Sequence, residues 1–158
     1  MSVESVKKFF EDKGLGACVR YSEIISDTVE NAAAMIGCQP AQIAKTLSFL
    51  IGEQPILIVA GGDAKIDNPK YKATFGAKAS MIPFDAAEQW TGHLPGGICP
   101  FACKDGVKVY LDESLKRFDV VYTGGGDAHH TICVTLTQLE QLSDYVSWVD
   151  VCKGWQGE

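Results

Sequence analysis

Apolar positions near the start of the chain recur with the period of a helix. Within residues 2–13 they are spaced three to four apart, Ser2 is a candidate cap, and Gly14 offers a stop. The apolar positions are Val3, Val6, Phe9 and Phe10. The pattern predicts an amphipathic first helix, followed by a short strand over residues 17–21.

A second helical pattern starts after Asp27. The side chain of Asp27 can accept a hydrogen bond from a backbone N–H of a first turn, so this residue is a candidate N-cap. Gly37 is a suitable stop and Pro40 suits the start of a further helical turn. Apolar residues at helical spacing lie between them, at Val29, Ala32, Ala33 and Ile36.

Two apolar runs in the middle of the chain predict a hairpin of central strands. They cover residues 45–51 and 55–60 and are separated by three residues. The later pattern predicts helices over 68–75 and 83–90, strands over 107–111, 120–123 and 131–136, and a closing helix over 137–142. Because strands are often adjacent and helices are grouped between them, an α+β fold is favoured over a regular βαβ repeat.

The length of 158 residues fits one domain, residues 1–158, that buries a core without disulfides or metals. Six cysteines are spread through this chain, so reduced thiols are expected. No apolar run of 18 residues and no basic and apolar leader is present, which predicts a cytoplasmic protein without a membrane partner.

The formal net charge of −6 argues against a protein that coats DNA or RNA through bulk electrostatics. A nucleic-acid partner would need a local basic patch. One candidate segment contains a single acid, Asp67, among four lysines: Lys65, Lys70, Lys72 and Lys78. By its charge pattern alone, this segment is either a solvated surface or a docking site for nucleic acid.

Lys45 departs from the apolar pattern of its strand. Since side chains alternate along a strand, Lys45 shares a face with Leu47, Phe49 and Ile51. Its ammonium must either reach a polar cavity or extend past the end of the strand to water.

Two glycine-rich loops are candidates for ligand binding. Residues 92–100 contain paired glycines, and residues 124–130 contain three glycines followed by Asp127, His129 and His130. Glycines allow a close approach of the backbone to a ligand, but a tight turn explains the first loop equally well. Neither loop has the spacing of a nucleotide-binding P-loop or a dinucleotide fingerprint, so no nucleotide cofactor is expected.

Cys99 and Cys103 form the only close cysteine pair. No second pair or HxE motif accompanies them, so neither a structural zinc nor a zinc deaminase site is expected. Cys99 is either a small buried hydrophobe or, with a histidine nearby in space, a nucleophile. If extended, His129 and His130 point to opposite faces, so at most one of them can join a common site.

Three segments in order resemble the YbaK/ProX family of editing deacylases, which is related to the insertion domain of prolyl-tRNA synthetase. They are Gln42-Ile43-Ala44-Lys45-Thr46-Leu47, Lys65-Ile66-Asp67, and Gly96-Gly97-Ile98-Cys99-Pro100-Phe101 followed by the loop at residues 124–126. The resemblance covers about residues 20 to 145. It implies a mixed, strongly curved sheet and a pocket for the aminoacyl-adenosine end of tRNA.

The resemblance also implies roles for particular residues. Lys45 would be the residue needed for deacylation, the substrate's own ribose hydroxyl would activate water, and no metal or cofactor would be required. The loop at residues 124–130 is richer in histidine than is common in the family, which bears on amino-acid specificity. Substrate-binding residues are expected at Gly96, Gly97, Ile98, Cys99, Pro100, Gly125, Gly126, His129 and His130. The tRNA itself is expected at Lys65, Lys70, Lys72 and Lys78.

The sequence therefore predicts a free-standing editing hydrolase that deacylates mischarged aminoacyl-tRNA. By family analogy the carrier is prolyl-tRNA bearing a small non-cognate amino acid, with alanine, cysteine, serine and threonine as candidates. A synthetase is a further candidate partner. The alternatives are a module of the same fold that binds tRNA or a synthetase without hydrolysis, and a thiol-based enzyme using Cys99.

Overall fold

The computed structural model describes residues 2–23, 28–94, 97–127 and 129–155. Its helices are α1 (Ser2–Asp12), α2 (Val29–Ile36), α3 (Asn68–Phe75), α4 (Ala87–Thr91) and α5 (Leu136–Leu142). Four 3₁₀ turns accompany them: η1 (Gly16–Cys18), η2 (Pro40–Gln42), η3 (Phe84–Ala86) and η4 (Glu113–Arg117). The strands are β1 (Val19–Tyr21), β2 (Ala44–Ile51), β3 (Gln54–Gly61), β4 (Lys65–Ile66), β5 (Lys108–Asp112), β6 (Val120–Gly124), β7 (His130–Thr135), β8 (Ser147–Val149) and β9 (Cys152–Lys153).

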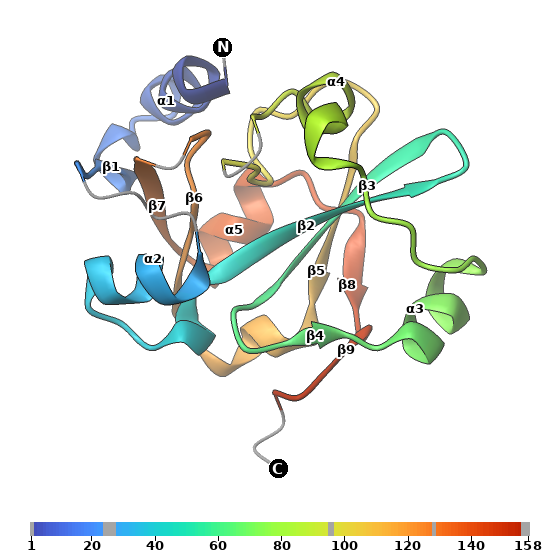
Figure 1. Cartoon of the computed structure of the whole chain (residues 1–158). Helices are drawn as coiled ribbons and strands as arrows, with labels where there is room; N and C mark the ends of the chain where they lie inside the picture. The colour runs from blue at the N-terminus through green and yellow to red at the C-terminus, as the bar shows by residue number, and fades with distance from the viewer. Residues whose placement is uncertain (1, 24–27, 95–96, 128, 156–158) are drawn as a thin grey trace.

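Two larger sheets form the framework (Figure 1). The central sheet has the order β2-β3-β5-β8 and is mixed, because β2 and β3 are antiparallel whereas β5 runs parallel to both β3 and β8. The second sheet, β1-β7-β6, is antiparallel. A parallel bridge between Ile43 and Tyr122 joins the two. The predicted α+β fold with a mixed, curved sheet is confirmed, and so is the hairpin of β2 and β3.

Local capping explains where two helices begin and end. The Thr28 side chain accepts a hydrogen bond from Asn31 N at 3.0 Å, and Gly37 ends α2 in the left-handed conformation. The N-cap of α2 is therefore Thr28 and not Asp27, which lies outside the described residues. Asp67 caps α3 in the same way, by accepting from Lys70 N at 3.2 Å.

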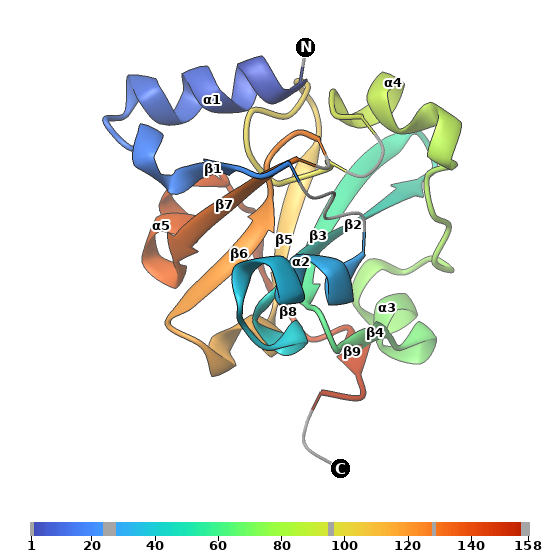
Figure 2. The ribbon, with the colours of Figure 1, turned by 60° about the vertical axis from the view of Figure 1, so that its left-hand side comes forward.

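The end of the chain departs from the prediction. The helix α5 does not close the fold, because β8 follows it as the edge strand of the central sheet and β9 follows β8. Strand β9 pairs with β4, a two-residue strand that the pattern does not indicate. The helix expected over residues 83–90 is divided into η3 and α4. Figure 2 shows α3, β4 and β9 together on one side of the molecule, with α2 in front of the sheets.

The central hairpin separates two apolar clusters. Leu57 and Val59 of β3 pack in the first cluster with Phe10 of α1 and Leu139 of α5. The alternate residues of β3 pack in the second cluster, together with Phe49 of β2 and Tyr71 of α3, and these are Ile56, Ile58 and Ala60. Both faces of β3 are thus buried, so the strand reads as a continuous apolar run.

Candidate active site

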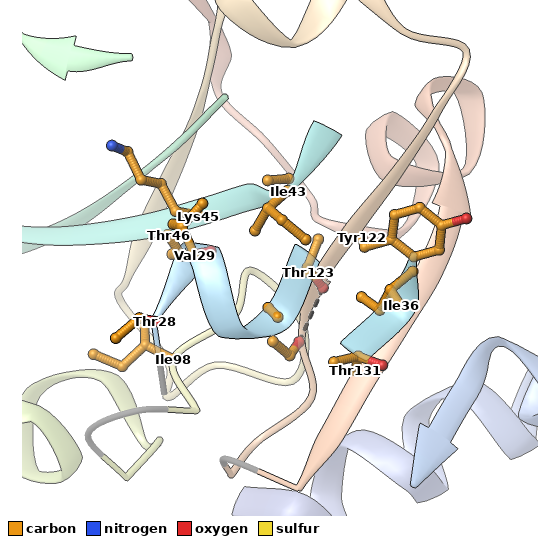
Figure 3. A pocket seen from close by; sticks show the side chains of 13 residues that line it. Thr28, Val29, Ile36, Ile43, Lys45, Thr46, Ile98, Tyr122, Thr123 and Thr131 are labelled. Atoms are coloured by element: carbon orange, nitrogen blue, oxygen red, sulfur yellow. Dashed lines mark hydrogen bonds between the residues drawn. The ribbon is translucent and has the colours of Figure 1, made fainter. Parts of the chain in front are cut away.

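A pocket of about 210 Å³ lies where α2, the start of β2 and the β6–β7 pair meet. Its lining is mostly apolar, with several threonine hydroxyls and one phenol. Figure 3 shows these side chains. The lining residues are Thr28, Val29, Ala32, Ile36, Ile43, Ala44, Lys45, Thr46, Ile98, Tyr122, Thr123, Gly124 and Thr131.

The two walls of the pocket come from segments far apart in the sequence. On one wall, Val29, Ala32 and Ile36 follow one another at helical spacing along α2. On the other, the bridge from Ile43 to Tyr122 holds β2 against β6. The helical spacing in α2 is visible in the sequence, but periodicity alone does not separate a pocket wall from core. Sequence reasoning therefore missed this wall and the contribution of Tyr122.

Lys45 lies at the edge of this pocket. It pairs with Ala60 of β3, on the strand face that carries Phe49 of the second cluster, as side-chain alternation predicts. Its ammonium donates hydrogen bonds to the carbonyl oxygen of Gly62, at 3.3 Å, and to that of Ala64. Burial lowers the pKa of Lys45 below its ordinary value. The side chain thus ends among backbone carbonyls and not in open solvent.

In Figure 3 the side chain of Lys45 points away from Tyr122 and Thr131 and extends on the opposite side of β2 from Thr28 and Ile98. An ammonium has three N–H donors, and two are used by the Gly62 and Ala64 carbonyls. The third donor has no partner within the part of the chain that the structure describes. A flexible four-carbon stem allows this group to turn toward a bound ligand.

The two glycine loops contact each other beside the pocket. Gly126 N donates to Gly97 O at 3.0 Å, and a Cβ atom on Gly97 would lie 2.2 Å from Asp127 N. Glycine at position 97 is therefore required for close loop packing. Ile98 lines the pocket, as does Gly124, whereas Gly96 lies outside the described residues.

The remaining residues expected to bind substrate do not line this pocket. A Cβ atom on Gly125 would lie 2.9 Å from His130 Cβ, so Gly125 is packed against the start of β7. Pro100 borders a separate hollow on the side of Phe9. Of the expected set within the described residues, only Ile98 reaches the pocket lining.

Cys99 is fully buried, and its Sγ lies 3.7 Å from Nε2 of His93. Sequence reasoning missed this neighbour. The same Nε2 lies 2.7 Å from the carbonyl oxygen of Phe101, which can only accept, so Nε2 carries the proton and cannot act as a base toward Cys99. Burial raises the pKa of Cys99 and raises that of Cys103 to about 12. Both are neutral thiols near pH 7, which argues against a thiol nucleophile.

The two histidines after the second glycine loop lie around Tyr21 of β1. His130 Nδ1 is 2.8 Å from Asp127 Oδ1, and His129 Nδ1 is 2.9 Å from the carbonyl oxygen of Ser22. The Tyr21 ring lies 5.9 Å from the ring of His129 and 5.3 Å from that of His130. His130 borders a hollow of about 100 Å³ next to α1, separate from the main pocket.

None of the four lysines expected to bind tRNA lines the pocket. Lys65 in β4 is exposed and close enough to Lys45 to influence its pKa. Lys70 forms an ion pair with Asp150 at 3.1 Å, whereas Lys72 and Lys78 are exposed. Lys65 belongs to β4, Lys70 and Lys72 belong to α3, and Lys78 follows α3. Figure 2 shows α3 and β4 on the same side of the molecule.

Within the described ranges, no group of three or more histidine, cysteine or acidic side chains is arranged to hold a metal ion. No helix among these residues is long and apolar enough to cross a membrane. All six cysteines are free thiols.

Comparison with known proteins identifies the family. The sequence profile of the aminoacyl-tRNA editing domain matches residues 26–142, which include the whole pocket lining. The chain belongs to this family. This editing domain is 45% identical over 157 residues to the uncharacterized protein YwhH of Bacillus subtilis (strain 168), covering 99% of this chain and 100% of that protein.

Two further matches are to proteins whose names refer to prolyl-tRNA synthesis. It is 27% identical over 105 residues to a proline–tRNA ligase of Lactiplantibacillus plantarum, covering 65% of this chain but only 18% of the ligase. A solved structure described as a candidate trans-editing enzyme for prolyl-tRNA synthetase superposes with a TM-score of 0.85 at 25% identity, covering 97% of this chain and 98% of that one. The resemblance seen in the sequence motifs is confirmed.

Proposed function

We propose that this editing domain is a free-standing hydrolase that cleaves the ester bond of mischarged aminoacyl-tRNA. Its substrate is tRNA(Pro) carrying a small non-cognate amino acid. The observation that carries the proposal is the position of Lys45, a partly buried ammonium at the edge of a small, mostly apolar pocket. The likeness to one segment of a proline–tRNA ligase and to a candidate trans-editing enzyme supports the choice of tRNA.

The pocket suits a small aminoacyl side chain. Its walls are Val29, Ile36 and Ile43, and the threonine hydroxyls add polar groups without charge. An apolar pocket separates amino acids that differ by one methylene by only about 1–3 kcal/mol. A synthetase that must reject small amino acids therefore benefits from a second hydrolytic site, which a free-standing editor supplies.

Lys45 is proposed to stabilise the charge that develops on the ester oxygen or to position the terminal ribose and phosphate. Among the described lining residues, Lys45 and Tyr122 are the titratable ones, and burial raises the pKa of Tyr122 so that its phenol stays neutral. The described lining contains no carboxylate and no histidine, so it offers neither of these groups as a general base. Activation of the attacking water by a hydrogen bond to the substrate's ribose hydroxyl fits this composition.

The competing function is a module that binds charged tRNA without hydrolysing it. The engagement of the Lys45 ammonium by the Gly62 and Ala64 carbonyls favours it, because such an ammonium could serve binding alone. Both functions require binding of charged tRNA, but only the hydrolase releases the amino acid catalytically.

The test uses tRNA(Pro) charged separately with alanine, cysteine, serine, threonine and proline. Release of the amino acid is followed for the wild type, Lys45→Ala, and Cys99→Ala as a matched control outside the pocket. We expect catalytic release of at least one small amino acid and loss of release in Lys45→Ala only. Binding of charged tRNA by a wild type that releases no amino acid faster than buffer would establish the binding module instead.

A further inference from the structure

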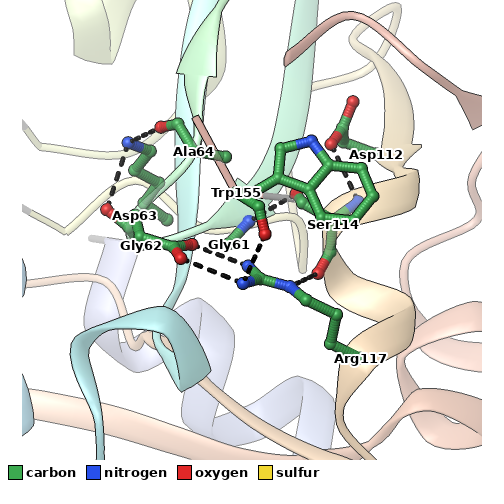
Figure 4. A network of polar contacts seen from close by, with 9 residues as sticks. Gly61, Gly62, Asp63, Ala64, Asp112, Ser114, Arg117 and Trp155 are labelled. Atoms are coloured by element: carbon green, nitrogen blue, oxygen red, sulfur yellow. Dashed lines mark hydrogen bonds and ion pairs between the residues drawn. The ribbon is translucent and has the colours of Figure 1, made fainter. Parts of the chain in front are cut away.

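The carbonyls that receive Lys45 belong to the turn formed by residues 61–64, directly after β3. Figure 4 shows this turn with the polar network beneath it. Ala64 N donates to Gly61 O at 3.0 Å and closes the turn. The placement of the ammonium therefore depends on what fixes this turn, since Lys45 itself sits on the neighbouring strand β2.

Asp63, inside the turn, forms a two-point ion pair with Arg117 of η4. Arg117 Nη2 lies 2.6 Å from Asp63 Oδ1, and Arg117 Nη1 lies 2.9 Å from Asp63 Oδ2. This paired geometry fixes orientation as well as distance, which a single contact does not. Only about a quarter to a third of each side chain is exposed, at 26% for Arg117 and 36% for Asp63.

Arg117 is itself anchored from two other directions. Its Nε donates to Ser114 O at 2.9 Å, and its Nη1 also donates to Trp155 O at 3.2 Å. The hydroxyl of Ser114 accepts from Gly61 N at 2.9 Å, at the start of the same turn. Asp112 in turn accepts from Ser114 N at 2.9 Å. The start of the turn at Gly61 and its interior at Asp63 are thus tied to η4, through Ser114 and Arg117 respectively.

We propose that Asp63 and Arg117 are positioning residues for Lys45, which hold the Gly62 and Ala64 carbonyls where they retain the ammonium at the pocket edge. This role rests on the proposed function in so far as it concerns catalysis. The geometric part, that the ion pair controls the environment of Lys45, stands apart from any activity.

The charge of Asp63 adds to its geometric role. The groups that act on Lys45 are, besides its own burial, Cys152, Asp63 and Glu30, which raise its pKa, and Lys65, which lowers it. Removal of the Asp63 carboxylate therefore favours the neutral amine, whereas removal of Arg117 leaves that carboxylate in place. The two variants share a loosened turn but differ in their effect on protonation.

The first arm of the test measures Lys45 without any tRNA. Trace labelling with acetic anhydride, read by mass spectrometry, gives the reactivity of each lysine in the wild type, Arg117→Met, Asp63→Ala and the double variant. The matched control is Lys116→Gln, which breaks the neighbouring ion pair with Glu113 on the same turn of helix and leaves residues 61–64 untouched. We expect labelling of Lys45 to rise at least about threefold in each single variant and not in the control, because a loosened turn no longer shields the amine with the Gly62 and Ala64 carbonyls.

The second arm measures deacylation. Arg117→Met and Asp63→Ala should lower turnover by about tenfold or more and leave the Michaelis constant for charged tRNA within about twofold, since a small misplacement of a positioned group affects the transition state. Asp63→Ala alone should also move the high-pH limb of activity to lower pH. The double variant should be no worse than the worse single variant, because both act through one pair. Arg117→Lys, which keeps the charge but not the two-point geometry, should fall between wild type and Arg117→Met.

Unchanged Lys45 labelling in Arg117→Met, Arg117→Lys and Asp63→Ala, with folding verified by circular dichroism, would overturn the proposal. A wild type that releases no amino acid from any charged tRNA would overturn the proposed function alone, and the labelling arm would still decide whether the ion pair positions Lys45.

Discussion

Ile43 and Tyr122 pair through a parallel backbone bridge at the floor of the pocket, where the central sheet meets the antiparallel sheet. Ile43 lies just ahead of β2 and Tyr122 lies within β6. The bridge brings the start of β2, which carries Lys45 two residues after Ile43, into the same pocket lining as residues of the other sheet. The pocket of this editing domain thus follows from one contact between two segments almost eighty residues apart.

Lys45→Ala should lower deacylation at least about 100-fold and leave the fold intact, since loss of one positioned stabiliser of developing charge typically has that effect. Single-turnover release from the preferred charged tRNA measures it. Lys45→Arg should not restore full activity, because a planar guanidinium does not match the compact ammonium that the Gly62 and Ala64 carbonyls hold. Near wild-type turnover by the alanine variant would end the assignment.

Cys99→Ala and Cys99→Ser should retain deacylation to within about a few fold, because the thiol is buried, neutral and outside the pocket lining. Thermal unfolding of both variants provides the control for packing loss. Abolished release by both variants, with melting curves like that of the wild type, would instead support a thiol nucleophile.

Activity should decline as pH rises through the pKa of Lys45, at a pH below the ordinary lysine value of 10.5. Activity falls with rising pH because the reaction requires the ammonium form of Lys45. This form is present below the pKa of Lys45 in the folded protein and lost above it, and burial has lowered that pKa. Lys45→Arg should keep its residual activity through the same range, because arginine stays charged. All rates are corrected for hydrolysis of the charged tRNA without enzyme. A wild-type pH–rate profile with the same shape as that of Lys45→Arg would contradict the prediction.

Lys70→Ala combined with Lys72→Ala should raise the Michaelis constant for charged tRNA at moderate salt and change turnover little, because these residues would only position the polyanion. The salt slope of binding should fall by roughly 0.7 for each phosphate that the variant no longer neutralises. Lys70→Ala also removes the ion pair with Asp150, so Lys72→Ala alone isolates the contribution of charge.

A minimal aminoacyl-adenosine substrate should be cleaved equally by the lysine variants and the wild type. Lys8→Ala on α1 is the matched control, since Lys8 is an exposed lysine away from α3. An unchanged salt slope on whole tRNA would show that the acceptor stem docks elsewhere.

Gly97→Ala should unfold more easily than wild type, by about 1–3 kcal/mol, because its Cβ would overlap the backbone of Gly126 and Asp127. Gly106→Ala is the comparison: position 106 has a positive φ but no atom within 4 Å of the added Cβ, so it reports backbone strain alone. Urea unfolding measures both. Equal stability of Gly97→Ala and wild type would mean that the two loops separate freely.

The central hairpin, the positions of α1, α2 and α3 and the strand face of Lys45 could be predicted from the sequence, because they depend on the local period of apolar residues. The N-cap of α2 was predicted one residue too early. The strands β8 and β9 were missed because they are three and two residues long and exist only through pairing with β5 and β4. The proximity of His93 to Cys99 was missed for a similar reason. The two residues are six positions apart in the chain, and no spacing rule predicts that their side chains meet.

Among the described residues that the sequence assigns to substrate binding, only Ile98 lines the pocket. The glycines at 97 and 126 meet each other, so their small size serves loop packing, which composition cannot distinguish from ligand binding. The histidines at 129 and 130 lie around Tyr21 because β1 pairs with β7, a contact between segments more than a hundred residues apart.

The wall of the pocket opposite α2 is built from two separate hydrogen-bonded ladders, β2-β3-β5-β8 and β1-β7-β6, that meet through the bridge at Ile43 and Tyr122. A seam of this kind can widen or narrow by sliding one ladder against the other, with every strand pairing retained. Substitutions at the side chains of α2 that face the pocket would then change which amino acid fits without breaking a strand pairing. The architecture thus separates the evolution of selectivity from the evolution of stability.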